Sequence, residues 1–181
     1  MNIVLIGFMG TGKTSVAKRV AKELDFKYVD TDEEVERVVG MSVPEIFQNF
    51  GETRFRSEEA AAVKRLATED NQVIATGGGV VLNPENLVAL KANGLVISLT
   101  ATPEVILERV SRRNNRPLLK VENPLGKIKE LLTQRDSLYK EAHVVIDTTN
   151  RTLPDLTQEV VGVYRGYVAR LEPEKLWNKY P

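Results

Sequence analysis

The segment at residues 7–14, with the sequence GFMGTGKT, constrains the fold of this chain more than any other feature. It fits the pattern G-x-x-x-x-G-K-[ST], in which a glycine-rich loop joins a strand to a helix and holds phosphate groups. An apolar run at residues 3–6 precedes the loop, and a helical pattern with Val16, Val20 and Leu24 on one face follows it. The loop therefore predicts an α/β nucleotide-binding protein.

The residue types of this loop suit the binding of ATP with magnesium. Glycines allow consecutive backbone N–H groups to converge on phosphate oxygens, and the following helix presents its positive end. Lys13 adds a point charge for the β and γ phosphates, and the Thr14 hydroxyl suits a Mg²⁺ ligand. Ser15 helps to start the helix. The predicted ATP-binding residues here are Gly10, Thr11, Gly12, Lys13, Thr14 and Ser15.

Four further apolar runs predict the rest of a sheet. They lie at residues 27–29, 73–75, 95–99 and 144–146, and turn residues and a helix-like stretch follow each of them. Pro44, Pro84 and Pro103 each stand at the start of a helix-like run, where proline is well tolerated. Alternation of strands and helices predicts a parallel sheet with right-handed crossovers.

Composition excludes several classes of function. Lys and Arg number 25 and so do Asp and Glu, so no charge excess attracts the chain to nucleic acid or an anionic membrane. The absence of cysteine excludes disulfides and thiolate metal sites and fits a reducing cytoplasm. No apolar run is long enough to span a bilayer, and no targeting segment precedes the loop. We expect one soluble, cytoplasmic domain over residues 1–181, with a monomer as the default.

Two carboxylates stand where the second predicted strand ends. Asp30 and Asp32 lie at the carboxyl edge of the sheet, where ligands bind in open α/β folds. We assign Asp30 to the magnesium shell through water, and Asp32 to an acceptor hydroxyl as orienter or weak base. Phosphoryl transfer gains mainly from such positioning and electrostatics. A helix N-cap at Thr31 or Asp32 is the alternative role.

Arg56 and a run of three glycines are candidates for holding the acceptor. Arg56 lies in a helix-like run, with Glu58 and Glu59 close enough in sequence to brace a guanidinium that suits bidentate recognition of a carboxylate. A surface pair of Arg56 with Glu59 or Glu52 is the simpler alternative. The glycines let backbone N–H groups approach a substrate closely; they are Gly77, Gly78 and Gly79.

A basic, irregular segment spans residues 111–126 and contains two prolines. Four arginines lie in or beside it: Arg109, Arg112, Arg113 and Arg116. Because Arg116 precedes Pro117, its backbone is expected to be extended rather than helical. We interpret residues 111–124 as a lid that closes over the phosphates. A nucleic-acid-binding patch is the competing interpretation, but the segment has no interleaved aromatic residues.

Other P-loop classes fit the sequence less well. A GTPase needs Asn-Lys-x-Asp and an Asp-x-x-Gly switch, whereas the sole Asn-Lys here, Asn178-Lys179, is followed by Tyr180. A motor or AAA-type ATPase is normally larger and has an acidic pair at the end of an apolar strand, whereas residues 144–147 end in a single Asp. A small-molecule kinase fits best. A non-catalytic nucleotide-binding regulator is the alternative from a different class.

The motifs, in their order along the chain, resemble those of shikimate kinases. They are the P-loop, Asp30-Thr31-Asp32, Phe55-Arg56, the glycine run, Arg116-Pro117-Leu118-Leu119 and Arg135-x-x-Leu138-Tyr139, and they cover roughly residues 1–165. The resemblance implies a three-layer P-loop kinase fold with a five-stranded sheet, like that of nucleoside monophosphate kinases. It also implies transfer of the γ phosphate of ATP to the 3-hydroxyl of shikimate, a cytoplasmic step of aromatic amino acid biosynthesis. Gluconate kinases and nucleoside monophosphate kinases are the nearest rivals.

The resemblance also implies roles for individual residues. Asp32 would hold ring hydroxyls, Arg56 and Arg135 would grip the carboxylate, and the glycine run would contact the acid. The acceptor-binding segment would span about residues 31–60. The implied catalytic residues are Lys13, Asp32 and Arg116, and the implied metal-binding residues are Thr14 and Asp30.

The resemblance further implies contacts to the nucleotide. Arg109 and the loop near Arg151 would flank the adenine, and Arg116 would reach the phosphates with the lid. The tail from residue 170 to 181, with Trp177, matches no family motif. His143, the sole histidine, is read as an ordinary edge or core residue without chemistry.

Overall fold

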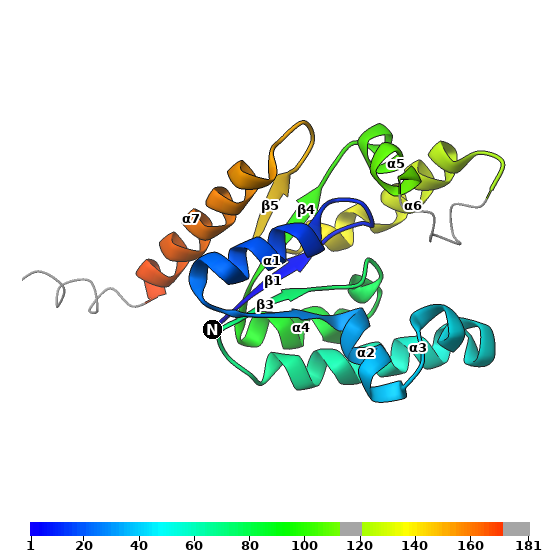
Figure 1. Ribbon diagram of the computed structural model, residues 1–181, viewed down its shortest axis with the longest axis horizontal. Coiled ribbons are helices and arrows are strands. Elements are labelled where there is room, and N and C mark those ends of the chain that lie inside the picture. Colours follow the sequence, from blue (N-terminus) through cyan, green and yellow to red (C-terminus); the bar gives the residue numbers. More distant parts are fainter. Residues whose placement is uncertain (113–120, 172–181) are drawn as a thin grey trace, which may run out of the picture.

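A single parallel sheet organises the molecule. The computed structural model describes residues 1–112 and 121–171, and its five strands carry helices on both faces (Figure 1). In spatial order they are β2 (Lys27–Asp30), β3 (Gln72–Ala75), β1 (Asn2–Ile6), β4 (Gly94–Thr100) and β5 (Val144–Asp147). Every predicted run is a strand, longer than expected by one or two residues. The predicted five-stranded parallel sheet is confirmed.

Helices form the two outer layers. One face carries α1 (Lys13–Leu24) and α7 (Leu153–Leu171). The other face carries α3 (Val43–Ala67), α4 (Pro84–Ala92), α5 (Pro103–Ser111), α6 (Pro124–Tyr139) and the short 3₁₀ turn η1 (Val80–Leu82). Pro44, Pro84 and Pro103 lie in the first turns of α3, α4 and α5, as predicted.

The central strands are apolar throughout because both of their faces are buried. On β1, Ile3 and Leu5 pack toward α1 and α7, whereas Val4 and Ile6 pack toward α3 and α4. None of these four side chains is more than 1% exposed. This is the packing that a continuous apolar run in a parallel sheet predicts.

A small third core lies between α2 (Thr31–Val39) and α3, which pack side by side (Figure 1). It consists of Val35, Ile46, Phe55 and Ala62. Within α3, Gly51 has φ 78° and ψ 178°, a conformation that is almost confined to glycine. The helix is therefore interrupted there, and its second piece carries Phe55 and Arg56. The sequence patterns did not predict this interruption.

Two expectations about local structure are corrected. The N-cap of α2 is Asp30, rather than Thr31 or Asp32, because its extended backbone (φ −125°, ψ 130°) brings the carboxylate to the N–H of Asp32. The irregular segment is also shorter than residues 111–126, since Ser111 ends α5 and Pro124, suited to a first turn, begins α6. Lid residues 113–120, with Arg113 and Arg116, and tail residues 172–181, with Trp177, lie outside the described residues.

His143 has a structural part in the sheet. Its backbone N–H donates to Val96 O, and its Nδ1 accepts from the Val96 N–H, both at 2.9 Å. Burial lowers the pKa of His143, and the Lys91 ammonium lowers it further. The ring is therefore held as a neutral acceptor at the edge of β4.

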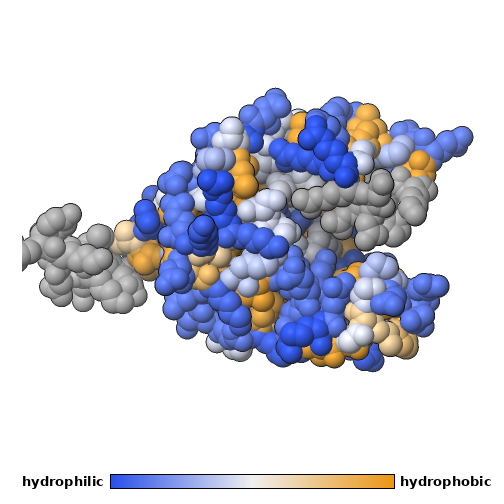
Figure 2. Space-filling model, in the orientation of Figure 1, coloured by the Kyte–Doolittle hydropathy of each residue, from blue (hydrophilic) through white to orange (hydrophobic). Residues whose placement is uncertain are grey.

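The face of the molecule shown in Figure 2 is mainly polar. On the face shown in Figure 2, hydrophilic residues predominate and hydrophobic ones appear in small separate groups. Among residues 1–112 and 121–171, no helix combines the length and the apolar character that crossing a membrane requires.

Candidate active site

A cavity of about 580 Å³ lies at the carboxyl ends of the central strands. In parallel α/β sheets this edge is where ligands bind. Its lining includes most of the residues predicted for the site, namely Gly10, Thr11, Gly12, Lys13, Thr14, Ser15, Asp30, Asp32, Gly77, Gly78, Arg109 and Arg151. Gly79, Arg56 and Arg135 stand beside it, as described below.

The phosphate loop requires glycine for two reasons. Gly7, Gly10 and Gly12 have φ values of 138°, 77° and 97°, in the region that other residues rarely adopt. In addition, a Cβ on Gly7 would lie 2.2 Å from the carbonyl oxygen of Leu99. The loop can therefore pass close to the backbone of β4 and turn into α1.

The start of α1 presents an electropositive end to the cavity. Gly12 caps α1 without a side-chain hydrogen bond, and no acidic residue lies in the first turn, so this end of the helix stays electropositive. Lys13 is 8% exposed, and its Nζ donates to Gly7 O at 2.7 Å and to Phe8 O at 2.9 Å. Thr11 Oγ1 donates inward to Phe8 O at 2.8 Å and so stabilises the loop.

Asp30 is held by hydrogen bonds at both carboxylate oxygens. Its Oδ1 accepts from the Asp32 N–H at 2.9 Å, and its Oδ2 accepts from the Tyr28 hydroxyl at 3.2 Å. Burial raises the pKa of Tyr28, the carboxylates of Asp30 and Glu33 raise it further, and a hydrogen bond with the Thr14 side chain acts in the opposite direction. Tyr28 thus lies between the two residues predicted to bind metal. The sequence reasoning missed it, although it stands two residues before Asp30.

Asp32 lies against the glycine run. A Cβ on Gly77 would be 2.5 Å from Asp32 Oδ1 and 3.0 Å from Glu59 Oε1, so glycine is needed there for space. The N–H of Gly77 donates to Thr31 Oγ1 at 2.9 Å, which fixes the turn to the start of α2. The second strand and the glycine run are therefore neighbours at the site, as β2 and β3 pair directly.

Arg56 is braced by two carboxylates. Its Nη1 lies 2.8 Å from Glu59 Oε2, and its Nη2 lies 3.1 Å from Glu52 Oε1. Glu58 pairs with Arg54 instead, because it lies on another side of the helix. The pairs proposed as the simpler alternative are thus present. Arg56 is nevertheless only 26% exposed, and its guanidinium lies directly against Gly79.

Glu59 is the buried member of this cluster, at 1% exposure. Burial raises the pKa of its carboxyl group, while the Arg56 guanidinium acts in the opposite direction. Its Oε2 binds Arg56, and its Oε1 has no hydrogen-bond partner among the described residues. The buried Glu59 carboxylate therefore holds Arg56 through one oxygen and leaves the other oxygen facing the glycine run.

Helix α6 contributes Arg135 and Tyr139 from successive turns. Arg135 Nη1 donates to Gly78 O at 3.4 Å, and the Tyr139 hydroxyl donates to the same oxygen at 2.6 Å. The guanidinium also lies 5.9 Å from the centre of the Phe8 ring. The spacing Arg135-x-x-Leu138-Tyr139 thus places two side chains on one carbonyl of the glycine run, so Arg135 and Arg56 approach that run from opposite helices.

Arg109 and Arg151 line the other end of the cavity. Arg109 Nη1 donates to Thr148 Oγ1 at 2.9 Å and to Gly10 O at 3.3 Å, and its Nη2 donates to Thr148 O at 2.8 Å. It therefore ties the phosphate loop to the segment after β5. Arg151 pairs with Glu159 on α7.

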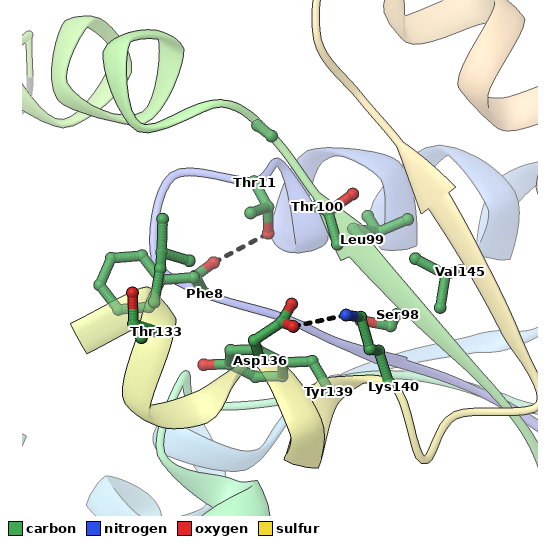
Figure 3. Close-up of a pocket in the computed structure, with 12 residues that line it drawn as sticks. Phe8, Thr11, Ser98, Leu99, Thr100, Thr133, Asp136, Tyr139, Lys140 and Val145 are labelled. Atoms are coloured by element: carbon green, nitrogen blue, oxygen red, sulfur yellow. Dashed lines mark hydrogen bonds and ion pairs between the residues drawn. The ribbon is translucent and has the colours of Figure 1, made fainter. Parts of the chain in front are cut away.

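A smaller cavity of about 360 Å³ lies against β4, β5 and α6 (Figure 3). Among the predicted site residues that the structure describes, Thr11 alone lines it. Its other lining residues include Ser98, Thr100, Val145, Thr133, Asp136 and Lys140. Asp136 and Lys140 form an ion pair of 2.5 Å, drawn in Figure 3. The predicted phosphate-loop residues and Asp32, Gly77 and Gly78 thus line the larger cavity.

Comparison with known proteins identifies the family. The family model described as shikimate kinase matches residues 9–165. The chain belongs to the shikimate kinase family. Shikimate kinase of Caldanaerobacter subterraneus subsp. tengcongensis is 52% identical over 163 residues, which cover 90% of this chain and 95% of the relative. A shikimate kinase of Thermus thermophilus is 40% identical over 177 residues, which cover 97% of this chain and 90% of the relative.

Solved structures agree with this family and with its fold. Shikimate kinase from Acinetobacter baumannii in complex with shikimate has a TM-score of 0.85 and 39% identity, covering 99% of this chain and 95% of that chain. A gluconokinase from Sinorhizobium meliloti 1021 has a TM-score of 0.63 at 17% identity, covering 99% and 97%. The gluconokinase is similar in fold alone.

Proposed function

We propose that this chain transfers the γ phosphoryl group of ATP to the 3-hydroxyl of shikimate, in aromatic amino acid biosynthesis. The observation that carries the proposal is a cavity lined by a complete phosphate loop and Asp32, with Arg56 and Arg135 against the glycine run beside it. Membership of the shikimate kinase family supports it. The Acinetobacter baumannii family member, solved with shikimate, supports the choice of acceptor.

The acceptor would lie over the glycine run. Its carboxylate would be bound by Arg56 and Arg135, since a guanidinium matches a carboxylate with two parallel hydrogen bonds. The backbone N–H groups of the run would add donors at close range. Asp32 would accept hydrogen bonds from ring hydroxyls, which orients the hydroxyl that attacks phosphorus.

The nucleotide would lie along the phosphate loop. The electropositive end of α1 and Lys13 would bind the β and γ phosphates, so Lys13 would leave the carbonyls of Gly7 and Phe8. Arg109 and Arg151 would flank the base. Arg116, from a lid at residues 111–124, would neutralise charge on the transferring group. We further propose one domain over residues 1–181, with the acceptor-binding segment at residues 31–60.

The residues fit Mg²⁺ as cofactor. Magnesium takes oxygen ligands and is held in nucleotide sites by one or two side chains together with phosphates and water. Thr14 and Asp30 offer such a set, and the described residues contain no cluster of three or more acidic or histidine side chains that would favour an all-protein metal cage. When bound, the ion would offset charge on the phosphate oxygens.

In this site the protein acts mainly by positioning. Asp32 orients the attacking hydroxyl and takes up its proton as a weak base, while Lys13 and Arg116 stabilise negative charge at the phosphoryl oxygens. Glu59 keeps Arg56 in place and so fixes the ring relative to the phosphate. The proposed lid would exclude water from the site.

An acceptor panel tests the function. ADP release would be followed with ATP and Mg²⁺ and with shikimate, gluconate or a nucleoside monophosphate, against an acceptor-free control. We expect release that depends on shikimate. Release with another acceptor would keep the kinase and reject this substrate, and nucleotide binding without turnover would favour the non-catalytic regulator.

A further inference from the structure

Tyr28 lies at the proposed metal site because side chains alternate between the two faces of the sheet along β2. Successive side chains of a strand face opposite sides of the sheet, so Tyr28 and Asp30 both face α1. Tyr28 packs against the core on the α1 side, whereas Val29 packs against the core on the other side. This places the phenol beside the carboxylate two residues later, and the hydroxyl donates to Asp30 Oδ2 at 3.2 Å.

The periodicity of α1 supplies the other half of the contact. Thr14 and Lys18 are four residues apart and therefore lie on one side of the helix. Lys18 Nζ lies 5.0 Å from the centre of the Tyr28 ring, and the Thr14 side chain lies close enough to the phenol to act on its pKa. The ring thus runs along α1 with its hydroxyl at Thr14. It bridges the two residues assigned to the metal.

We propose that Tyr28 is a positioning residue for the magnesium–nucleotide complex, acting through Asp30 and Thr14; the proposal rests on the magnesium site proposed above. A phenol is one donor and can also accept. Its hydroxyl donates to Asp30 Oδ2 and keeps lone pairs that can accept from the neighbouring Thr14 side chain. Both oxygens of Asp30 are then fixed, because Oδ1 is held by the Asp32 N–H.

The hydroxyl can be separated from the ring experimentally. Tyr28→Phe keeps the aromatic packing on β2 and the contact with Lys18, and it removes the link between Thr14 and Asp30. Groups that orient metal ligands from outside typically contribute 10- to 100-fold to metal affinity. Since Asp30 is assigned to the metal through water, we expect an effect at the lower end, about 10-fold.

The test measures ADP binding by calorimetry without shikimate, once in EDTA and once in excess Mg²⁺. The ratio of the two dissociation constants is the metal-dependent gain. For Tyr28→Phe we expect the gain to fall about 10-fold while binding in EDTA is unchanged. Tyr164→Phe is the matched control, since it removes a phenol on α7, where the ring packs on Phe26 at 5.7 Å. Its gain should equal that of the wild type.

A double variant tests whether Tyr28 acts through Asp30. In an Asp30→Asn background, Tyr28→Phe should lower the metal-dependent gain much less than in the wild type, because the group on which it acts is already altered. Four results would overturn the proposal. Tyr28→Phe could have equal effects in the two backgrounds, leave the metal-dependent gain unchanged, or weaken ADP binding equally in EDTA and in Mg²⁺. The wild type could also show no metal-dependent gain. Because shikimate is absent, failure of the proposed acceptor would leave this result intact.

Discussion

The proposed carboxylate clamp predicts a large effect from a single methyl group at Gly79. A Cβ there would lie 2.4 Å from Nη1, 2.5 Å from Nη2 and 2.7 Å from Cζ of Arg56. The backbone of Gly79, at φ −101° and ψ 0°, is open to alanine, so Gly79→Ala keeps the turn and its N–H. The guanidinium is the end of a flexible side chain and will move instead. The substitution therefore displaces Arg56 without removing it.

The size of the effect follows from the geometry. Non-bonded carbon contacts are favourable at about 3.5–4.0 Å, so the guanidinium must shift by roughly 1 Å. That shift would lengthen its hydrogen bonds to Glu59 (2.8 Å) and Glu52 (3.1 Å) beyond the normal range of donor–acceptor distances. A hydrogen bond to a charged group contributes about 1.5–3 kcal/mol, which corresponds to shikimate binding weakened about 10- to 150-fold.

Steady-state kinetics with each substrate varied will measure this effect. We expect Gly79→Ala to raise KM for shikimate by this factor, with KM for ATP unchanged, and Arg56→Ala to act in the same direction. Gly162→Ala on α7 is the control, because its Cβ meets nothing within 4 Å. Equal changes in both KM values, or a KM for shikimate at the wild-type level, would refute the assignment of Arg56 to the acceptor.

Three further predictions address catalysis and stability. Asp32→Asn should retain ATP binding and lose most phosphorylation, because the acceptor loses a charged partner with little change of shape; wild-type turnover would contradict this role. The folded protein disfavours the charged His143 ring, so the pKa of His143 is lower in the folded state than its ordinary value of about 6.5. The contribution of His143 to stability is therefore complete above pH 6.5 and decreases as the pH falls toward the folded-state pKa. Acidification through that window should therefore lower Tm more in the wild type than in His143→Asn, and parallel pH curves would exclude the effect. Gly51→Ala should lower the free energy of unfolding in urea by about 1–3 kcal/mol, because φ 78° with ψ 178° is strained for alanine; a free energy of unfolding equal to that of the wild type would contradict this.

The sheet and the phosphate loop could be predicted from the sequence because each depends on local patterns. Apolar runs such as residues 3–6 reflect burial on both faces, and the glycines of the loop reflect backbone angles that few other residues adopt. The predicted strands were one or two residues too short, since polar residues such as Asn2 and Asp147 can extend a strand ladder. The five apolar runs already indicated five strands, and the family resemblance implied the same number.

The contacts inside the site depend on residues that are distant in the sequence. The approach of Arg56 to Gly79 and the joint binding of Gly78 by Arg135 and Tyr139 follow from the packing of α3 and α6 around the glycine run. Propensity rules do not contain this information. The role of Tyr28 could have been suggested by its spacing from Asp30, because residues two apart on a strand share a face.

The break in α3 shows a different limit. A single glycine within a helical pattern is compatible with an uninterrupted helix. The interruption at Gly51 accompanies the packing of Val35 of α2 on both pieces of α3, a contact that the local pattern does not contain. The N-cap of α2 is similar. Asp30 serves as cap and as candidate metal-shell residue at once, so the two roles that the sequence offered as alternatives for this segment are compatible.

The most direct test of the central claim is identification of the product. The protein would be incubated with ATP, Mg²⁺ and shikimate, and the product examined by phosphorus–proton correlation NMR. The account predicts one new phosphate ester whose phosphorus couples to the ring proton at C3, and loss of that signal in Asp32→Asn. ADP release without a phosphorylated acid, or an ester at another hydroxyl, would contradict it.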